Sequence, residues 1–254
     1  MRSSRYTYGD SGFAAERLDL VARAFEPSSR AFLERVVPHA PDLAVDLGCG
    51  PGNTTRLLAA VLRAERTVGL DRSGPFLDRA RRGAPPGVEF IEHDVVRVPF
   101  PVGPADVVSC RLLVSHLPDR AAVLARWATQ LAPGGLLLLD ELEGISSDEP
   151  AFVAYLAIAR DVVEGAGGRL FVGPELATLD DPPGTERASE EVVSFAIAPT
   201  DSARIFGMNL AVLIERGEID RDDGLVEALD AIVRRGDGSA TIWRMRQLAF
   251  RRLP

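Results

Sequence analysis

A carboxylate beside three alternating glycines is the feature of this sequence whose residue types and spacing best suit ligand binding. Asp46 lies near the end of the apolar run 43–47, and Gly48, Gly50 and Gly52 follow at every second position. Glycines allow a sharp backbone turn and let a ligand approach main-chain atoms closely. The pattern predicts a strand and a tight loop whose main-chain N–H groups bind a ligand with hydrogen-bond acceptors or negative charge.

The residues after the glycine loop predict the helix that would supply those N–H groups. Apolar side chains recur at helical spacing over residues 57–62. We expect Asn53 or Thr54 to cap this helix with a side-chain oxygen. An ordinary strand-to-helix turn can show the same order of strand, glycine loop and helix. The segments that follow are therefore needed to distinguish a ligand site from such a turn.

Two further carboxylates end predicted strands. Asp71 ends the apolar strand 66–70, on the order of 20 residues beyond the glycine loop, where a strand-end acid accepts hydrogen bonds from ribose hydroxyls. Asp94 follows the predicted strand 88–92. An ionised carboxylate has two oxygens and so matches a pair of neighbouring hydroxyls. The dinucleotide fingerprint needs the spacing Gly-x-Gly-x-x-Gly, which this loop lacks.

The loop 48–52, with its Gly-x-Gly-x-Gly spacing and the preceding Asp46, resembles motif I of the class I S-adenosylmethionine (SAM) dependent methyltransferases. The resemblance covers nearly the whole chain, and the chain is similar in detail to actinobacterial small-molecule (natural-product) methyltransferases. It implies an α/β, Rossmann-like fold with a seven-stranded sheet in the order 3-2-1-4-5-7-6, strand 7 antiparallel, and helical lid insertions. The other segments that carry it are 16–18, 111–119, 131–141 and 206–210.

The resemblance implies SAM as the cofactor and assigns its contacts. Asp71 would bind the ribose, Asp94 the adenine amine, and the N–H of Val95 an adenine ring nitrogen. Tyr8 and Arg17 would close the pocket from the N-terminal side, since an arginine holds a carboxylate by two parallel bonds and the methionine end of SAM offers one. The other residues assigned to the cofactor site are Asp46, Gly48, Gly50, Asn53, Arg72 and Arg111.

The chemistry of methyl transfer narrows the search for a catalytic residue. The reaction is a direct displacement, so alignment of the acceptor supplies much of the rate, and a base helps only where the acceptor is a hydroxyl. Histidine has a suitable pKa. His39 lies in a proline turn and His93 belongs to the adenine region, which leaves His116 as the candidate base, with a packed structural histidine as the alternative. The residues assigned to the acceptor are Glu141, Tyr155 and Asn209. The predicted reaction is O- or N-methylation of a small-molecule, natural-product intermediate.

Helices before and after the core are expected to cover these residues. Two helices, over residues 14–25 and 28–37, should precede the first strand. Periodicity further predicts helices at 151–165, 174–179, 202–216 and 222–235, and the last two strands at 191–197 and 241–250. The chain is thus expected to form a single methyltransferase domain over residues 1–254. Its parts are an N-terminal helical cover (1–38), a SAM-binding core (39–145), and lid helices with the last two strands (146–254).

Composition argues against several other classes of protein. A hydrophobic content of 46% over 254 residues can build a real core, and a net charge of −8 disfavours a nucleic-acid partner. No apolar stretch approaches the roughly 20 residues of a membrane span, and no apolar signal segment opens the chain, so we expect a cytoplasmic enzyme without a membrane partner. Two cysteines without metal-ligand spacing predict reduced thiols and no metal site. A homodimer stays open.

Two other functions fit parts of the pattern. An oxidoreductase could bind a nicotinamide dinucleotide through the same strand and helix, but the glycine spacing and Asp94 argue against it. A SAM-binding protein of this fold that does not transfer methyl, such as a cyclase or a regulatory partner, would keep the same cofactor residues. The acceptor is not encoded in these motifs, because lid pockets vary on a common fold.

Overall fold

Seven strands form one sheet in the order β3-β2-β1-β4-β5-β7-β6, which confirms the expected order. The computed structural model describes residues 12–254. β1 pairs in parallel with β2 and β4, whereas β7 runs antiparallel to both β5 and β6. The strand order therefore reverses between β1 and β4, the position where open α/β sheets bind their ligands.

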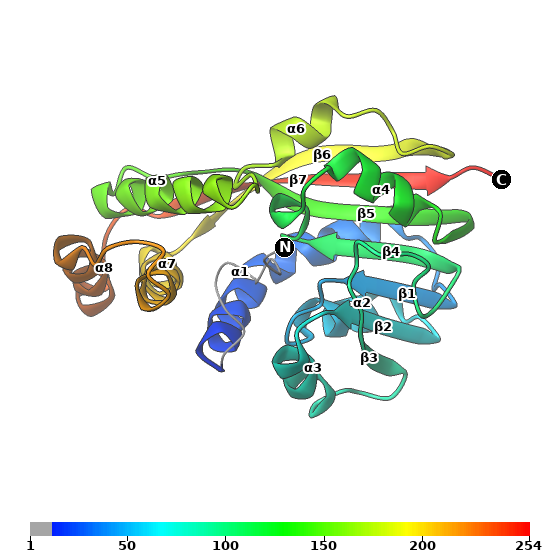
Figure 1. Cartoon of the computed structure of the whole chain (residues 1–254), viewed down its shortest axis with the longest axis horizontal. Coiled ribbons are helices and arrows are strands. Elements are labelled where there is room, and N and C mark those ends of the chain that lie inside the picture. The colour runs from blue at the N-terminus through cyan, green and yellow to red at the C-terminus, as the bar shows by residue number, and fades with distance from the viewer. Residues whose placement is uncertain (1–11) are drawn as a thin grey trace.

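The elements alternate along the chain as an α/β fold requires (Figure 1). The strands are β1 (Leu43–Leu47), β2 (Arg66–Asp71), β3 (Val88–Glu92), β4 (Ala105–Arg111), β5 (Leu131–Ser146), β6 (Thr185–Ile197) and β7 (Thr241–Arg252). The helices are α1 (Gly12–Val36), α2 (Asn53–Leu62), α3 (Gly74–Arg81), the 3₁₀ turn η1 (Val114–His116), α4 (Arg120–Ala128), α5 (Pro150–Gly165), α6 (Gly173–Thr178), α7 (Pro199–Glu215) and α8 (Asp223–Arg235).

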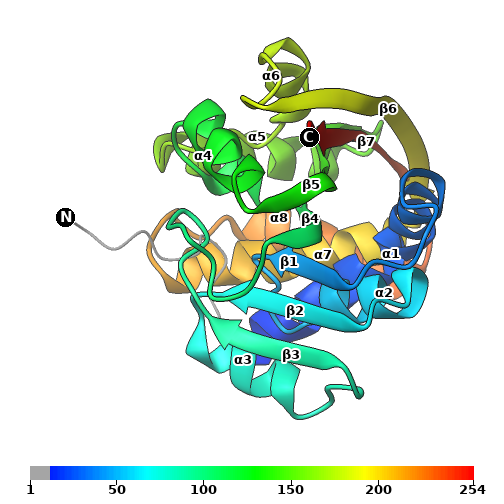
Figure 2. The same cartoon turned by 90° about the vertical axis from the view of Figure 1, so that its right-hand side faces the viewer.

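Helices cover both faces of the sheet because its central strands are apolar on both sides. On one face Phe32 of α1 and Leu58 of α2 pack with Ala44 and Leu138 of the strands. On the other face Trp127 of α4 belongs to the core cluster that the strands form with α6. Figure 2 shows α4 and α1 on opposite sides of the strands. The core thus fixes the strand ends from both directions.

A separate apolar cluster holds the lid. It joins α5, α7 and α8 to the far ends of β5 and β7, with Phe25 of α1, Phe206 of α7 and Met245 of β7 all buried within it. These three helices lie together at one end of the molecule, away from β1, β2 and β3 (Figure 1). β5 and β7 stay paired as far as Ser146 and Ile242, so the strands themselves carry the lid.

The N-terminal cover differs from the expectation of two helices, because α1 is a single helix with Pro27 inside it. A proline removes one backbone N–H donor and usually ends a helix. Here the same helix face is buried on both sides of the proline: Phe25 packs into the lid cluster and Phe32 against the sheet. Burial of this continuous face outweighs the lost hydrogen bond.

Two local boundaries also differ. Residues 131–135 include Pro133, Gly134 and Gly135, a pattern that predicts a helix stop and a turn before a buried strand. In the structure β5 already begins at Leu131, which pairs with Ala105 before a register shift to the pair Val107 and Leu136. β6 begins at Thr185, well before the expected residue 191, because β7 supplies a partner along its whole length. Backbone pairing therefore extends both strands past their apolar residues.

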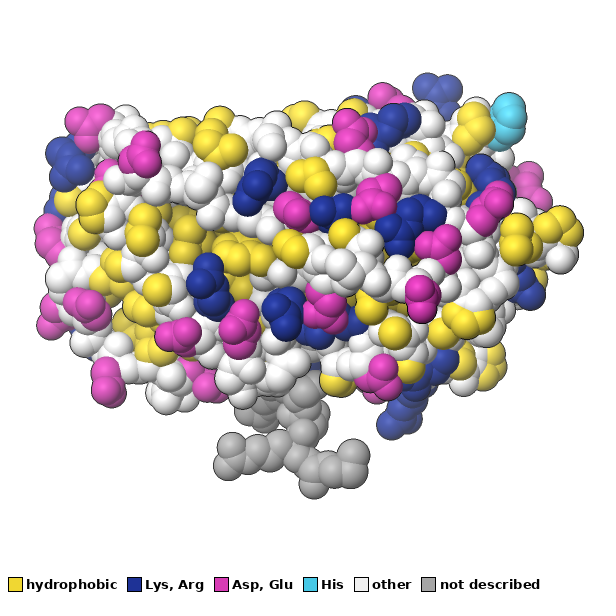
Figure 3. All heavy atoms as spheres, turned by 90° about the horizontal axis from the view of Figure 1, so that it is seen from above, with side chains coloured by type: hydrophobic (Ala, Val, Ile, Leu, Met, Phe, Trp, Pro, Cys, Tyr) yellow, Lys and Arg dark blue, Asp and Glu magenta, His cyan; other side chains and the backbone are white. Residues whose placement is uncertain are grey.

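The outer surface of the molecule carries charges of both signs. Seen from above, acidic and basic side chains are interspersed, and a strip of hydrophobic side chains lies among them in the left half of the view (Figure 3). Within residues 12–254, no helix combines the length and the apolar character that crossing a membrane would require.

Candidate active site

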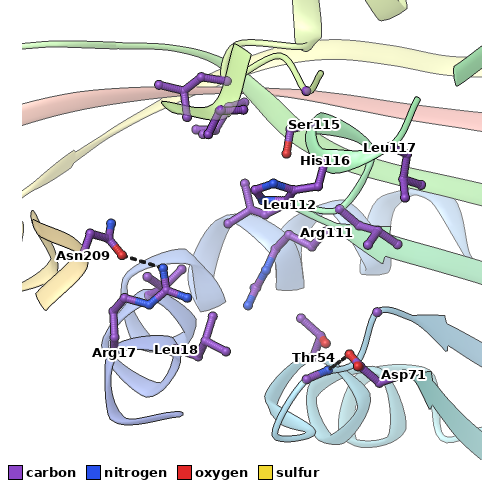
Figure 4. A pocket seen from close by; sticks show the side chains of 18 of the residues that line it. Arg17, Leu18, Thr54, Asp71, Arg111, Leu112, Ser115, His116, Leu117 and Asn209 are labelled. Carbon is purple, nitrogen blue, oxygen red and sulfur yellow. Dashed lines mark hydrogen bonds between the residues drawn. The ribbon is translucent and has the colours of Figure 1, made fainter. Parts of the chain in front are cut away.

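A cavity of about 820 Å³ lies over the carboxyl ends of the first strands, where α1 and the lid cover them. Its lining joins residues that are far apart in the sequence: Arg17 and Leu18 of α1, Asp71 of β2, the turn after β4, and Asn209 of α7 (Figure 4). Of the residues assigned from the sequence, those that line it are Arg17, Gly48, Gly50, Asn53, Asp71, Arg72, Asp94, Val95, Arg111, His116, Tyr155 and Asn209. Tyr8 lies outside the described residues.

The glycine loop needs its glycines for two separate reasons. Gly48 and Gly50 have φ of 65° and 53°, which L side chains rarely adopt. A Cβ on Gly48 would also lie 2.8 Å from Cδ1 of Leu113 in the turn after β4. The loop and that turn therefore touch directly, at the edge of the cavity.

Asp46 supports this loop from beneath and does not line the cavity. Its Oδ2 accepts hydrogen bonds of 2.6 Å from the hydroxyls of Thr54 and Thr55. Burial raises the pKa of Asp46 to about 6, and the two hydroxyl bonds oppose that rise. The expected helix cap is wrong, since Gly52 is the N-cap residue and no side chain caps α2. The Thr54 hydroxyl is bound to Asp46, and Asn53 donates instead to Asp19.

Asp71 connects the end of β2 to the glycine loop. Its Oδ2 accepts from the N–H of Gly50 at 2.8 Å, and its Oδ1 accepts from the N–H of Ser73 at 2.8 Å. Burial raises the pKa of Asp71, and these two backbone bonds oppose the rise. Each oxygen has a second lone pair, so the carboxylate can accept further hydrogen bonds from a molecule in the cavity.

The end of β3 forms the next part of the wall. Asp94 Oδ1 accepts from the N–H of Val96 at 3.3 Å, and the Asp94 carbonyl accepts from the N–H of Arg97 at 2.8 Å. Trp127 Nε1 donates to the carbonyl of Val95 at 2.7 Å, which ties this loop to α4. The loop is thus fixed by its own bonds and by a buried indole.

Three helices meet through a short chain of hydrogen bonds on the opposite side of the cavity. Arg17 Nη1 of α1 donates to Asn209 Oδ1 of α7 at 2.6 Å, and Asn209 Nδ2 donates to the hydroxyl of Tyr155 of α5 at 2.6 Å. Arg17 is only 4% exposed. In Figure 4 the Arg17 and Asn209 side chains face one another across from Asp71. The amide orientation of Asn209 is set by both neighbours.

Arg111 joins α1 to the central strands. Its Nη1 donates to Ser29 Oγ at 3.1 Å, and that hydroxyl donates to Asp140 Oδ2 at 2.7 Å. The guanidinium also lies 5.7 Å from the ring centroid of Phe25. Burial lowers the pKa of Arg111, and the charge of Asp140 opposes this. Ser29 was not identified from the sequence, because a serine inside an expected helix gives no signal of a partner on a distant strand.

The turn after β4 carries His116 into the cavity. Leu112 has a φ of 54°, and η1 follows directly. The His116 ring points toward the space between Arg17 and Arg111 (Figure 4). Burial, followed by the positive charges of Arg17, Arg72 and Arg120, lowers the pKa of His116 to about 4. The imidazole is therefore neutral at pH 7 and a weaker base than an ordinary histidine.

Glu141 holds this turn from behind and does not line the cavity. The side chain is 0% exposed, and its Oε1 accepts from the N–H groups of Leu113 and Val114, each at 2.8 Å. Its Oε2 is buried, with no hydrogen-bond partner among residues 12–254. Burial raises the pKa of Glu141 to about 7, opposed by the backbone bonds. Glu141 therefore supports η1 through these main-chain bonds.

A second set of contacts holds η1 from the lid side. The carbonyl of Ser115 accepts from the N–H of Arg169 at 2.8 Å, and the carbonyl of Val114 accepts from Arg120 Nε at 3.3 Å. Both arginines form ion pairs with Glu175 of α6: the N–O distance is 3.2 Å for Arg120 and 2.7 Å for Arg169. None of these roles was identified from the sequence, because the set depends on two pairings, Ser115 with Arg169 and Arg120 with Glu175, that join segments more than 50 residues apart, where no periodic pattern links them.

Comparison with known proteins adds independent findings. Residues 45–139 match the family model described as a methyltransferase domain. The chain is 40% identical over 156 residues to a trans-aconitate 2-methyltransferase of Methylobacterium nodulans. This match covers 58% of this chain and 59% of that protein. It is also 33% identical to an uncharacterized transposon protein of Streptomyces fradiae, over 54% of this chain and 41% of that one. The chain thus spans less than two thirds of the length of these curated relatives.

Solved structures share the fold at low sequence identity. A putative methyltransferase from Bacillus halodurans superimposes with a TM-score of 0.61 at 18% identity, over 89% of this chain and all of that one. A [4+2]-cyclase superimposes with a TM-score of 0.54 at 16% identity, over 91% of this chain and 82% of that one. These likenesses establish the Rossmann-like fold of class I methyltransferases for this chain, a fold that also supports other chemistry.

Proposed function

We propose that this chain, whose residues 45–139 match the methyltransferase domain, transfers a methyl group from SAM to a small-molecule acceptor. One observation carries the proposal. Within the matched segment, the strand-end carboxylate of Asp71 is hydrogen-bonded to Gly50 of the glycine loop and lines the cavity. A carboxylate so placed offers its remaining lone pairs to the two hydroxyls of a ribose.

The residues around the cavity offer a partner for each part of SAM. Asp71 would bind the ribose, and Asp94 with the N–H of Val95, just past the neighbouring strand β3, would bind the adenine. Arg17 would hold the methionine carboxylate, an arrangement that its burial beside Asn209 favours. Gly48, in contact with Leu113, would leave room for the sulfur beside the turn that carries His116. When bound, SAM supplies a methyl group activated by its positive sulfonium.

The chain's own part in the reaction is mainly alignment. η1 is held by Glu141 on one side and by Arg169 on the other, so the residues beside the acceptor are fixed before binding. We propose that the neutral His116 accepts the proton of an acceptor hydroxyl as the oxygen attacks. With a pKa of about 4 it stays unprotonated at neutral pH, so it is always available as an acceptor.

The titration of His116 is a direct check on this role. We expect its ring to titrate near pH 4 in the folded protein, followed by NMR of the imidazole protons and assigned with a His116→Asn variant. Because the folded pKa lies below the ordinary 6.5, the unfolded state binds more protons between pH 4 and 6.5. This residue should therefore cost stability as the pH falls through that window. A ring that titrates above pH 6 would contradict the proposed environment.

The proposal extends to the class of acceptor. We propose O-methylation of a natural-product intermediate, and trans-aconitate is the defined alternative because the curated relatives carry that substrate in their names. The mechanism proposed for His116 applies to a hydroxyl acceptor. A carboxylate acceptor would need no base, because it is already ionised at neutral pH.

Two measurements test the proposed function. Calorimetry with S-adenosylhomocysteine (SAH), the product form of the cofactor, should show binding to the purified chain. Incubation with SAM and either trans-aconitate or extracts of the producing organism should yield a methylated product by mass spectrometry. Binding of SAH without any methylated product would favour a SAM-binding protein that does not transfer methyl. No binding of SAH would refute the proposal.

A further inference from the structure

Three aromatic rings form one wall of the cavity at its lid end. The rings of Tyr155 and Phe206 are stacked with centroids 4.2 Å apart and an interplanar angle of 18°. Phe206 and Trp243 follow with centroids 6.1 Å apart at 26°. All three residues line the cavity and are at most 5% exposed. The wall combines side chains of α5, α7 and β7.

This wall is rigid because its polar atoms are occupied. Trp243 Nε1 donates to the hydroxyl of Thr241 at 2.7 Å, and the Tyr155 hydroxyl accepts from Asn209. Phe152 packs edge-on against Phe206, with centroids 5.4 Å apart at 82°. Aromatic rings held in this way present a preformed apolar surface that loses little side-chain entropy when a ligand binds.

The lining residues that the strands and helices of the lid end supply are also uncharged. The lining residues that β5, α5, α7 and β7 supply include no acidic or basic side chain; they are Leu142, Ile145, Tyr155, Leu156, Ala159, Val163, Ile205, Phe206, Asn209 and Trp243. Arg216, just past the end of α7, is exposed, and Arg17 is bonded to Asn209. Charged lining residues otherwise come from the strand ends and the N-terminal half of α1, which we assign to the cofactor.

We infer that the acceptor is a neutral, ring-bearing apolar molecule that packs against the Tyr155, Phe206 and Trp243 wall, and that a small polycarboxylate is a poor fit. This inference rests on the proposed function, since the cofactor is taken to fill the strand end of the cavity. Apolar surface gains free energy on leaving water for such a wall. A carboxylate would lose its hydration there without a charged partner.

The test compares two probes on protein saturated with SAH, by calorimetry. 2-Naphthol is neutral, has two fused rings and one hydroxyl, and trans-aconitate carries three carboxylates. We expect 2-naphthol to bind at least about tenfold more tightly than trans-aconitate, the ratio that a modest difference in burial and desolvation would give. Equal binding, tighter binding of trans-aconitate, or no binding of 2-naphthol would overturn the inference.

A matched pair of variants locates the binding. Ile145 of β5 lines the lid end, and Ile242 of β7 does not line the cavity and is exposed. Ile145→Glu should raise the dissociation constant of 2-naphthol by about tenfold or more, because it places a carboxylate in the apolar chamber. Ile242→Glu should leave it unchanged, although the two positions are neighbours in the paired strands. Loss of 2-naphthol binding in both variants, or in neither, would contradict the assignment.

Binding of SAH tests the proposed function, whereas binding of the two probes tests the class of acceptor, so the two can fail separately. Both variants should bind SAH as the wild type does, which also shows that they are folded. If the wild type fails to bind SAH, the proposed function fails, and the probes are then compared on the free protein. If the free protein binds 2-naphthol more tightly than trans-aconitate, that result would still support an apolar ligand. If it shows no such preference, an apolar ligand is refuted.

Discussion

Replacing Asp71 by alanine is expected to weaken SAH binding by about 10² to 10³-fold. The variant loses charge-assisted hydrogen bonds to the ribose, each worth about 1.5–3 kcal/mol. It also leaves the N–H of Gly50 without its present acceptor, because Asp71 Oδ2 accepts that bond at 2.8 Å. The side chain thus acts both on the ligand and on the loop that contacts it, so the loss exceeds that of a single bond.

Calorimetry of the Asp71→Ala variant with SAH measures this loss, and Glu92→Ala is its control. Glu92 ends β3 directly opposite Asp71 in the paired strands, is exposed and does not line the cavity. The control should bind SAH as the wild type does. An Asp71→Ala variant with an affinity within threefold of the wild type would remove Asp71 from the cofactor site.

The Glu141→Gln variant should gain stability relative to the wild type as the pH rises from about 4.5 to above 7. Glu141 has a folded pKa of about 7 against an ordinary value of 4.5, so the folded wild type binds more protons than the unfolded chain in this window. The contribution of Glu141 to the stability of the wild type then falls with rising pH, by roughly 3 kcal/mol for a shift of this size. A glutamine does not ionise and escapes this loss.

Denaturant titrations of both proteins between pH 4.5 and 8 measure the difference in free energy of unfolding. Glu143→Gln is the control, because Glu143 lies two residues further along β5 and bonds Arg246 through both carboxylate oxygens at 2.8 and 3.0 Å. Both oxygens of this carboxylate are bonded, whereas Oε2 of Glu141 has no hydrogen-bond partner among the described residues, so the pair of variants separates the buried, unpartnered carboxylate from a glutamine placed elsewhere in β5. A gap between Glu141→Gln and the wild type that stays constant with pH would show that Glu141 is ionised throughout.

Local patterns in the sequence predicted the sheet and the cofactor residues at its edge. The existence of the strands near the site and the placement of Gly48, Gly50 and Asp71 at their ends follow from short apolar runs that end at turn-forming or acidic residues. The order of the strands was implied by the family resemblance, and the structure confirms it. Whether these residues bind SAM stays a prediction. The continuity of α1 was missed because Pro27 is a local stop signal, whereas the burial that overrides it comes from the sheet and the lid.

Long-range pairings within the site could not be predicted in the same way. Arg17 and Asn209 meet across 192 positions, and Glu141 binds N–H groups 28 and 27 positions away. Nothing in the spacing of these residues indicates the contact, because it depends on how α7 and β5 are packed. The pKa of His116 is a further example, since it depends on burial and on three arginines from separate segments.

The lid is carried by paired strands, which limits where it could bend. β5 and β7 remain hydrogen-bonded as far as Ser146 and Ile242, so a hinge at the base of the lid would have to break main-chain bonds of the sheet. Between α1 and α7, by contrast, the contact at the cavity includes the side-chain bond from Arg17 to Asn209. Separating α1 from α7 would leave the main-chain bonds of the sheet intact, but it would break this buried side-chain bond and part the apolar contacts that Phe25 makes in the lid cluster.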